Sequence, residues 1–216
     1  LALAGTFISP QYNLGPLAPA SARSLGYVIS VFAALGGLSA FGAHAIKNCL
    51  SPIFIRLIED GWVTHLATNG AGIIHDWELA YQGATSEDVR ANVADGSFGA
   101  WEETGYYLNL ALIVGAYEGL GYGESIGAMV EREALASPSP ALLEKQIAER
   151  AAVEPDRAAA AIDLLDAIRR SGVPVGTMSI SHPHKSAGLQ AAAYRLGVPF
   201  TGHPMFGHDI LYEHAL

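Results

Sequence analysis

The stretch that most constrains the fold is residues 62–78, with the sequence WVTHLATNGAGIIHDWE. Residues 62–68 form a mostly apolar run that is typical of a buried strand. A turn of small residues, NGAG at 69–72, follows this run, and a helical pattern of apolar side chains begins at Ile73. A strand, a tight turn and the start of a helix in this order predict a unit of a parallel α/β sheet.

The turn at 69–72 is the first candidate for a ligand site. In parallel α/β sheets the ligand crevice lies outside the carboxyl ends of the strands, and a helix N-terminus there favours an anion. The segment GAGIIH carries the first two glycines of the dinucleotide pattern and has His75 at the place of the third. We therefore predict a phosphate-bearing ligand, with packing between the strand and the helix as the alternative reason for the small residues.

The composition of the chain limits the kinds of molecule that it is expected to bind. The chain has 216 residues, of which half are apolar, and a formal charge of −9. Its length favours one large domain, and its acidity argues against a nucleic-acid surface and leaves small molecules or protein partners. Cys49 is the single cysteine, which excludes an internal disulfide framework, fits a cytoplasmic location and is expected to be a buried structural thiol.

A second question is whether residues 24–46, which carry no Lys, Arg, Asp or Glu, cross a membrane. The stretch is long enough to do so, but glycines and His44 interrupt it. Strands that are buried on both faces of a parallel sheet are similarly apolar, so we predict no membrane span.

Along the chain, residues 1–24 contain three prolines and are expected to form an irregular N-terminal arm, and residues 25–216 a single α/β dinucleotide-binding-like domain. Thr85 to Asp88 match a capping box that would start a helix at Thr85. The expected fold is a Rossmann-like parallel sheet flanked by helices. We predict strands at 38–43, 62–68, 173–180 and 198–201, and helices at 51–61, 73–82, 85–95, 102–118, 123–136, 142–152, 156–170 and 187–196.

Histidines gather in the last part of the chain, after two predicted strand ends. Five of the eight fall within the last 35 residues, together with two carboxylates: His182, His184, His203, His208, His214, Asp209 and Glu213. Such side chains can bind a metal or move protons, although their spacing matches no zinc signature. Loop capping is the alternative role for several of them.

Other candidates lie near the central turn. His75 and Asp76 could orient a ligand, and four carboxylates could bind a cation such as a polyamine or serve capping and solvation instead: Glu87, Asp88, Glu102 and Glu103. Lys47 is a candidate for contact with an anion or, if buried, for imine chemistry. A solvated surface lysine is the alternative.

Residues 41–60 and 63–76, with GVPF at 197–200 and GHDI at 207–210, resemble deoxyhypusine synthase and its bacterial relatives. The resemblance implies a Rossmann-like fold that binds NAD, in a homotetramer whose active sites lie between paired subunits. In that family NAD accepts a hydride from spermidine, and an aminobutyl group passes through a lysine imine to the target lysine.

Residue by residue, the resemblance implies that Asn69, Gly70 and Ala71 match the turn that contacts NAD. His44 lies where the family has another cofactor contact, and Asp209 matches a carboxylate that holds the polyamine. The family's catalytic lysine motif is absent from these residues. Either the sequence lacks a C-terminal part, or this relative does different chemistry, for which Lys47 or Lys185 are the candidate lysines.

The leading hypothesis is thus an NAD-binding protein that oxidises or transfers an aminoalkyl group of a small amine. It assigns catalysis to His75, His208 and Asp209, with a histidine as general base. It assigns the cofactor to His44, Asn69, Gly70, Ala71, Gly72 and Asp76, and it includes no metal. The alternatives are a metal-dependent hydrolase that uses His203, His208, Asp209 and His214, and a non-catalytic NAD-binding or assembly module.

Overall fold

The computed structural model describes residues 37–99, 101–205 and 214–216. Contacts divide the chain into Leu1–Gly37 and Leu38–Leu216. The predicted arm at 1–24 lies outside the described residues. The elements of the described part are β1 (Gly37–Phe41), α2 (Ala43–Lys47), α3 (Ser51–Glu59), β2 (Val63–Asn69), α4 (Gly70–Gln82), α5 (Val89–Asp95), α6 (Glu102–Glu118), α7 (Tyr122–Arg132), β3 (Ala134–Ser137), α8 (Pro140–Arg150), α9 (Pro155–Ser171), β4 (Gly176–Ser179), the 3-10 turn η1 (Lys185–Ala187), α10 (Leu189–Arg195) and β5 (Phe200–His203).

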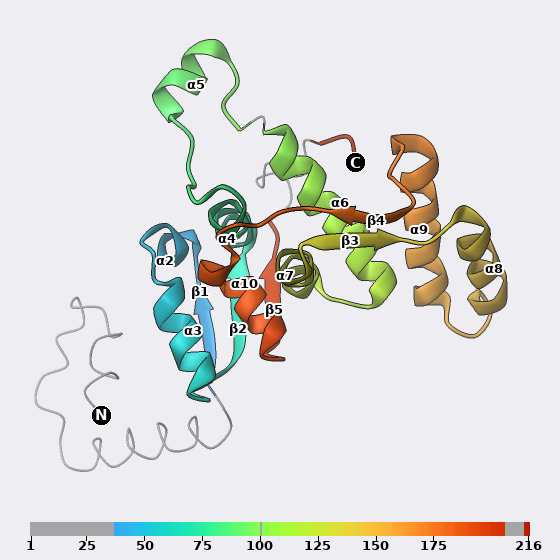
Figure 1. Ribbon diagram of the computed structural model, residues 1–216, viewed down its shortest axis with the longest axis horizontal. Coiled ribbons are helices and arrows are strands. Elements are labelled where there is room, and N and C mark those ends of the chain that lie inside the picture. The colour runs from blue at the N-terminus through green and yellow to red at the C-terminus, as the bar shows by residue number, and fades with distance from the viewer. Residues whose placement is uncertain (1–36, 100, 206–213) are drawn as a thin grey trace, which may run out of the picture. The chain divides into compact units, whose positions relative to one another are not determined.

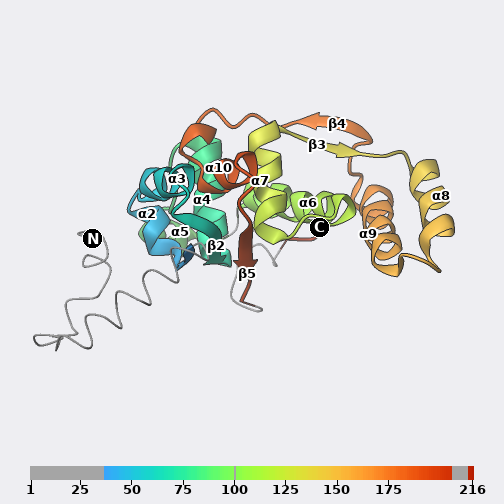
Figure 2. The same ribbon diagram turned by 90° about the horizontal axis from the view of Figure 1, so that it is seen from below.

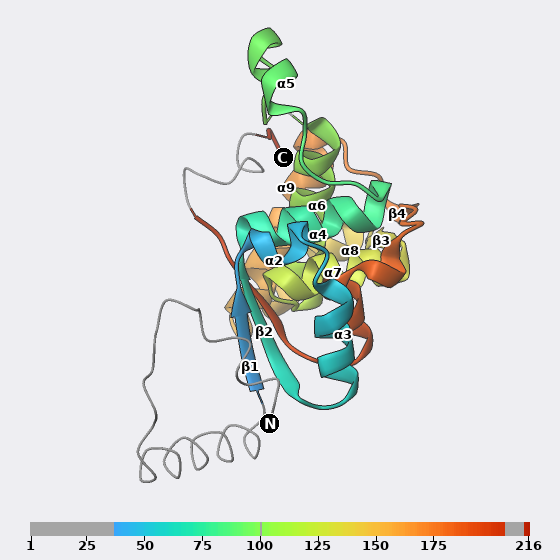
Figure 3. The same cartoon turned by 90° about the vertical axis from the view of Figure 1, so that its left-hand side faces the viewer.

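The main sheet has three parallel strands in the order β1-β2-β5. In the register of β2 and β5, Leu66 lies opposite Phe200 and Asn69 opposite His203. Helices α3, α4, α7 and α10 contact these strands from one side of the sheet (Figures 1 and 3). The prediction of a parallel α/β sheet flanked by helices is therefore confirmed.

Strand β2 runs into α4 without an intervening loop. Asn69 ends the strand and caps the helix, because its Oδ1 atom accepts a hydrogen bond of 2.9 Å from the backbone N–H of Gly72. A Cβ atom at Gly72 would lie 2.1 Å from Oγ1 of Thr68, whose hydroxyl donates to the carbonyl of Phe41 in β1. Gly72 is therefore required by packing between the strands and the helix.

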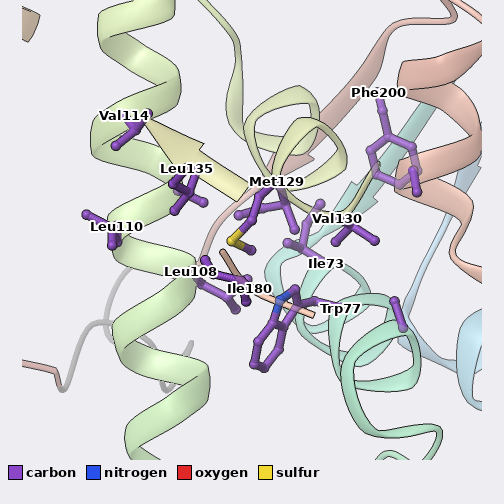
Figure 4. Close-up of a cluster of buried hydrophobic side chains, with 14 of the residues drawn as sticks. Ile73, Trp77, Leu108, Leu110, Val114, Met129, Val130, Leu135, Ile180 and Phe200 are labelled. Carbon is purple, nitrogen blue, oxygen red and sulfur yellow. The ribbon is translucent and has the colours of Figure 1, made fainter. Parts of the chain in front are cut away.

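The core forms where α4 meets α6 and α7. Ile73 and Trp77 of α4 are almost fully buried and lie with Leu108, Met129 and Ile180 in one apolar cluster (Figure 4). Trp77 also donates from Nε1 to Nε2 of the buried His182, at 3.1 Å. Burial of these side chains fixes one side of α4 against the body of the protein.

Two predicted elements differ in the structure. The helix expected at 123–136 ends at Arg132, because Glu133 takes a left-handed backbone conformation with φ 52°, and β3 follows it. The strand expected at 173–180 is β4, which pairs with β3 in an antiparallel sheet of its own (Figure 2). The strand that was assigned to the parallel sheet therefore pairs with β3, from which α8 and α9 separate it in the sequence.

Two further predictions are wrong. Asp88, and not Thr85, caps α5, since its Oδ1 atom accepts from the N–H of Ala91 at 3.0 Å. Cys49 is exposed, in a left-handed turn directly after α2, and is not a buried thiol.

No helix within residues 37–99, 101–205 and 214–216 is both long enough and apolar enough to cross a bilayer.

Candidate functional site

A cavity of about 490 Å³ lies along one face of α4. Positions three or four apart on a helix share a face, and α4 contributes five such residues to the wall: Ala71, Ile74, His75, Glu78 and Gln82. Lys47 lines the cavity from the end of α2, and residues of the segment 84–101 form the opposite wall. Because α2 follows β1 and α4 follows β2, both of these walls come after the carboxyl end of a parallel strand.

Three polar side chains in this cavity form a hydrogen-bonded chain. Oγ1 of Thr85 donates to Oε2 of Glu78 at 2.5 Å, and Nδ1 of His75 lies 2.5 Å from the same hydroxyl. A hydroxyl has one proton, so Thr85 must accept the bond from His75. The proton of the neutral ring is thereby assigned to Nδ1, and Nε2 is left with a free lone pair and no partner among the described residues.

Glu78 is a buried carboxylate with an exposed fraction of 8 %. Besides Thr85, it accepts a long hydrogen bond of 3.4 Å from Oγ1 of Thr104, and its Oε2 atom lies 3.5 Å from Nδ1 of His75. Within the described residues no lysine or arginine pairs with it. The carboxylate is therefore positioned to stabilise a positive charge on the imidazole of His75.

Glu87 organises the outer wall of the cavity. Its Oε1 atom accepts from the N–H of Gly99 at 2.9 Å, and its Oε2 atom accepts from Nδ2 of Asn92 at 2.5 Å and from Nε1 of Trp101 at 3.4 Å. The residue before it, Ser86, has φ 70°, a conformation that is strained for a side chain other than glycine. These bonds fasten the segment 84–99 into an arm that carries α5 (Figure 1). The arm contributes the ring of Phe98 to the cavity wall.

Aromatic and apolar groups cover much of that wall. Phe98 and Trp101 line the cavity together with Val89, and Phe98 and Val89 are each more than half exposed. Large apolar side chains that remain in contact with solvent at a cavity mark a surface that a ligand can cover.

The structure places the residues predicted for the turn in different roles. Ala71 lines the cavity, whereas Asn69 caps the helix and Gly72 packs on Thr68. Gly70 is buried at the start of α4. His44 is exposed on α2 and is not part of the cavity wall.

The prediction that Asp76 binds the cofactor does not agree with the position of its side chain. Asp76 points into the core, where its two oxygens accept bonds of 2.9 Å from the backbone N–H groups of Leu189 and Gln190. Burial raises the pKa of this carboxyl group, and the bonds from α10 oppose that rise. Asp76 therefore anchors the start of α10.

The C-terminal histidines are only partly within the described residues. His208 and Asp209 lie outside them. His203 contacts Oγ1 of Thr201 at 3.1 Å on β5, and His214 lies 3.0 Å from Oε1 of Glu102. No three His, Cys, Asp or Glu side chains of the described part are grouped so that they could hold a metal ion.

Lys185, one of the two candidate lysines, has a structural role. Its Nζ atom donates to Oε2 of Glu133 at 2.9 Å and to the carbonyl of Glu131 at 3.0 Å, and it does not line the cavity. Lys47 does line the cavity, although it is exposed and not buried as imine chemistry would require.

Sequence reasoning missed Glu78, Thr85 and the aromatic wall. Glu78 could have been found, because it lies one helical turn after His75 on the same face of the predicted helix. Thr85 was interpreted as a helix cap, which concealed its contact with His75.

Comparison with known proteins gives no match. No protein-family model, no curated protein and no solved structure matches the chain. The chemistry of the cavity therefore has to be inferred from the residues that line it.

Proposed function

We propose that this chain is an enzyme that binds a small amine in the α4 cavity and oxidises it with NAD, as in an aminoalkyl transfer of the deoxyhypusine synthase type. The observation that carries the proposal is the chain from His75 through Thr85 to Glu78. A base whose tautomer is fixed by a hydroxyl and a buried carboxylate, inside a cavity, is the arrangement that general base catalysis needs.

The walls of the cavity favour a cationic amine. Glu78 and Glu87 contribute two carboxylates, and Trp101 and Phe98 contribute aromatic rings. Carboxylates form strong charge-assisted hydrogen bonds with ammonium groups, and aromatic faces attract cations.

In the proposed reaction His75 first takes a proton from the bound ammonium group at its Nε2 atom. The neutral amine then has a nitrogen lone pair that can form a C=N bond as a hydride leaves the adjacent carbon. Glu78, acting through Thr85, stabilises the imidazolium form of His75. NAD, when bound, supplies the acceptor for the hydride.

The cofactor is proposed to bind at the first turn of α4. Ala71 lies both in that turn and in the cavity wall, so a ligand there would be adjacent to the amine. The N-terminus of a thirteen-residue helix favours the negative charge of phosphate groups. Gly72 is unavailable to them, since its N–H is bonded to Asn69.

Three further properties are proposed on the resemblance of residues 41–60 and 63–76. They are a Rossmann-like variant of the parallel sheet, a homotetramer and a cytoplasmic location. The exposed free thiol of Cys49 supports the last, because such thiols persist in reducing compartments. Light scattering on the purified protein measures the oligomeric state.

The test is an assay of NAD reduction with spermidine and putrescine, combined with calorimetric binding of each amine. We expect the wild type to reduce NAD and His75→Gln to lose the activity while it still binds the amine. His184→Gln is the matched control, because His184 is exposed and outside the cavity wall. Amine and NAD binding without turnover would identify a non-catalytic module and overturn the proposed reaction, and the absence of amine binding would overturn the proposed site.

A further inference from the structure

The cavity contains opposite charges that do not pair with each other. Lys47 lines it together with Glu78 and Glu87. The ion pairs of the described residues include none between Lys47 and either carboxylate, although pairs as long as 3.8 Å occur elsewhere. Each carboxylate instead accepts bonds from neutral donors, namely threonine hydroxyls for Glu78 and amide or indole N–H groups for Glu87.

Charges that line one cavity of about 490 Å³ without pairing with each other can contact the same ligand. A ligand with one positive group would satisfy the carboxylates and leave the ammonium group of Lys47 without a partner. A ligand with both charges would satisfy all of them, since carboxylate and ammonium groups each form charge-assisted hydrogen bonds.

We infer that the preferred amine is a zwitterion, that is, a short chain with an amine at one end and an acid group at the other. Its ammonium group faces Glu78 and Glu87, and its acid group is bound by Lys47. The inference rests on the proposed function, because it concerns the same cavity and the same amine, and it adds the acid group and the role of Lys47.

The apolar part of the wall fits the middle of such a molecule. Ile74, Val89 and Phe98 also line the cavity and can cover a chain of methylene groups. The volume admits short ω-amino acids of different lengths, so a length series reports how far apart the two charged ends of the cavity lie.

The test compares three ligands of equal chain length by calorimetry in the absence of NAD: γ-aminobutyrate, butylamine and butyrate. The same comparison is made with ε-aminocaproate, hexylamine and caproate. We expect the better of the two amino acids to bind at least about tenfold more tightly than its matched amine. In Lys47→Gln this ratio should fall to about one, because the amino acid loses affinity and the amine does not.

Lys145→Gln is the matched control, because Lys145 is an exposed lysine of α8, outside the cavity wall, and it should keep the wild-type ratio. Equal binding of amino acid and amine by the wild type would overturn the inference and leave the amine site intact. A Lys47→Gln variant that loses NAD affinity but keeps the ratio would also overturn it, since Lys47 would then contact the cofactor. The absence of binding by every amine overturns the proposed function itself.

Discussion

Asp76 and Glu78 are two residues apart on α4, are both buried, and work on opposite sides of the helix. Asp76 faces the core and accepts hydrogen bonds from the backbone of α10. Glu78 faces the cavity and accepts them from hydroxyl groups of Thr85 and Thr104. Backbone donors cannot move away from their helix, whereas hydroxyl groups can rotate and pass on a proton. Asp76 and Glu78 are both buried carboxylates, but their hydrogen-bond partners differ. These partners make Asp76 an anchor and Glu78 a candidate catalytic group.

Replacement of the anchor should have the largest effect on stability. Asp76→Ala leaves the N–H groups of Leu189 and Gln190 buried without acceptors, and we expect a loss of roughly 3–5 kcal/mol in the free energy of unfolding. Glu78→Gln keeps an acceptor for one of the two threonines and places an amide N–H beside the hydroxyl oxygen of the other, so it should lose only about 1 kcal/mol. Urea denaturation measures both. Equal losses in the two variants would contradict the difference between the two sides of α4.

On the cavity side the main effect should be on rate. His75→Gln removes the base, and we expect the rate of amine oxidation to fall by about 10²–10⁴-fold with little change in stability. Thr85→Val, which keeps the shape of the side chain and removes the hydroxyl, should lower the rate and shift its pH profile. A Thr85→Val enzyme with the wild-type profile would show that the hydroxyl does not connect His75 to Glu78.

The core side of α4 also has a titratable partner, His182. Trp77 donates to its Nε2 atom and the carbonyl of Ile180 accepts from Nδ1, so the ring is neutral in the folded protein. Burial lowers the pKa of His182 below its ordinary value of 6.5. The unfolded state therefore binds the proton more readily, and stability should be fully present above pH 6.5 and decrease as the pH falls through the folded-state pKa.

Urea denaturation over a pH series measures this dependence, and His182→Gln should remove part of the slope. An unchanged slope in that variant would assign the acid sensitivity to other groups.

The smallest expected effect is at the rim of the cavity. Ser86 has φ 70°, so Ser86→Gly should raise the free energy of unfolding by about 0.5–1 kcal/mol. Thermal denaturation measures the change, with Ser97→Gly on the same arm as the control. A destabilised Ser86→Gly variant would mean that the serine side chain contributes contacts that outweigh its backbone strain.

The parts of the fold that could be predicted are those in which local sequence and tertiary packing agree. In residues 62–82 the apolar run, the small-residue turn and the helical period all indicate the same unit, and β2 and α4 form there. The segment 123–136 could not be predicted in full, because the helix ends where Glu133 bonds to the N–H of His182, a residue distant in sequence. Tertiary contacts of this kind leave no local pattern.

The candidate site was predictable to a similar degree. His75 follows from its place after the turn, and the carboxyl ends of the strands indicate where the cavity lies. The role of Asp76 was not predictable, since an acidic residue at a helix start resembles a ligand contact until its partners on α10 are known. The contact between His75 and Thr85 depends on the path of the chain after α4, which the sequence pattern does not determine.

Because β2 continues directly into α4, only part of the cavity wall is free to move. The α4 wall is continuous with a central strand and has no hinge, so it is the stiff side of the cavity. The bonds of Glu87 to Asn92 and Gly99 lie within the arm at 84–99, whereas Thr85 connects the arm to Glu78 and His75 of α4. None of the residues of α5 is buried. We therefore expect entry of a ligand to require movement of the arm, which the hydrogen bonds of Thr85 to Glu78 and His75 oppose.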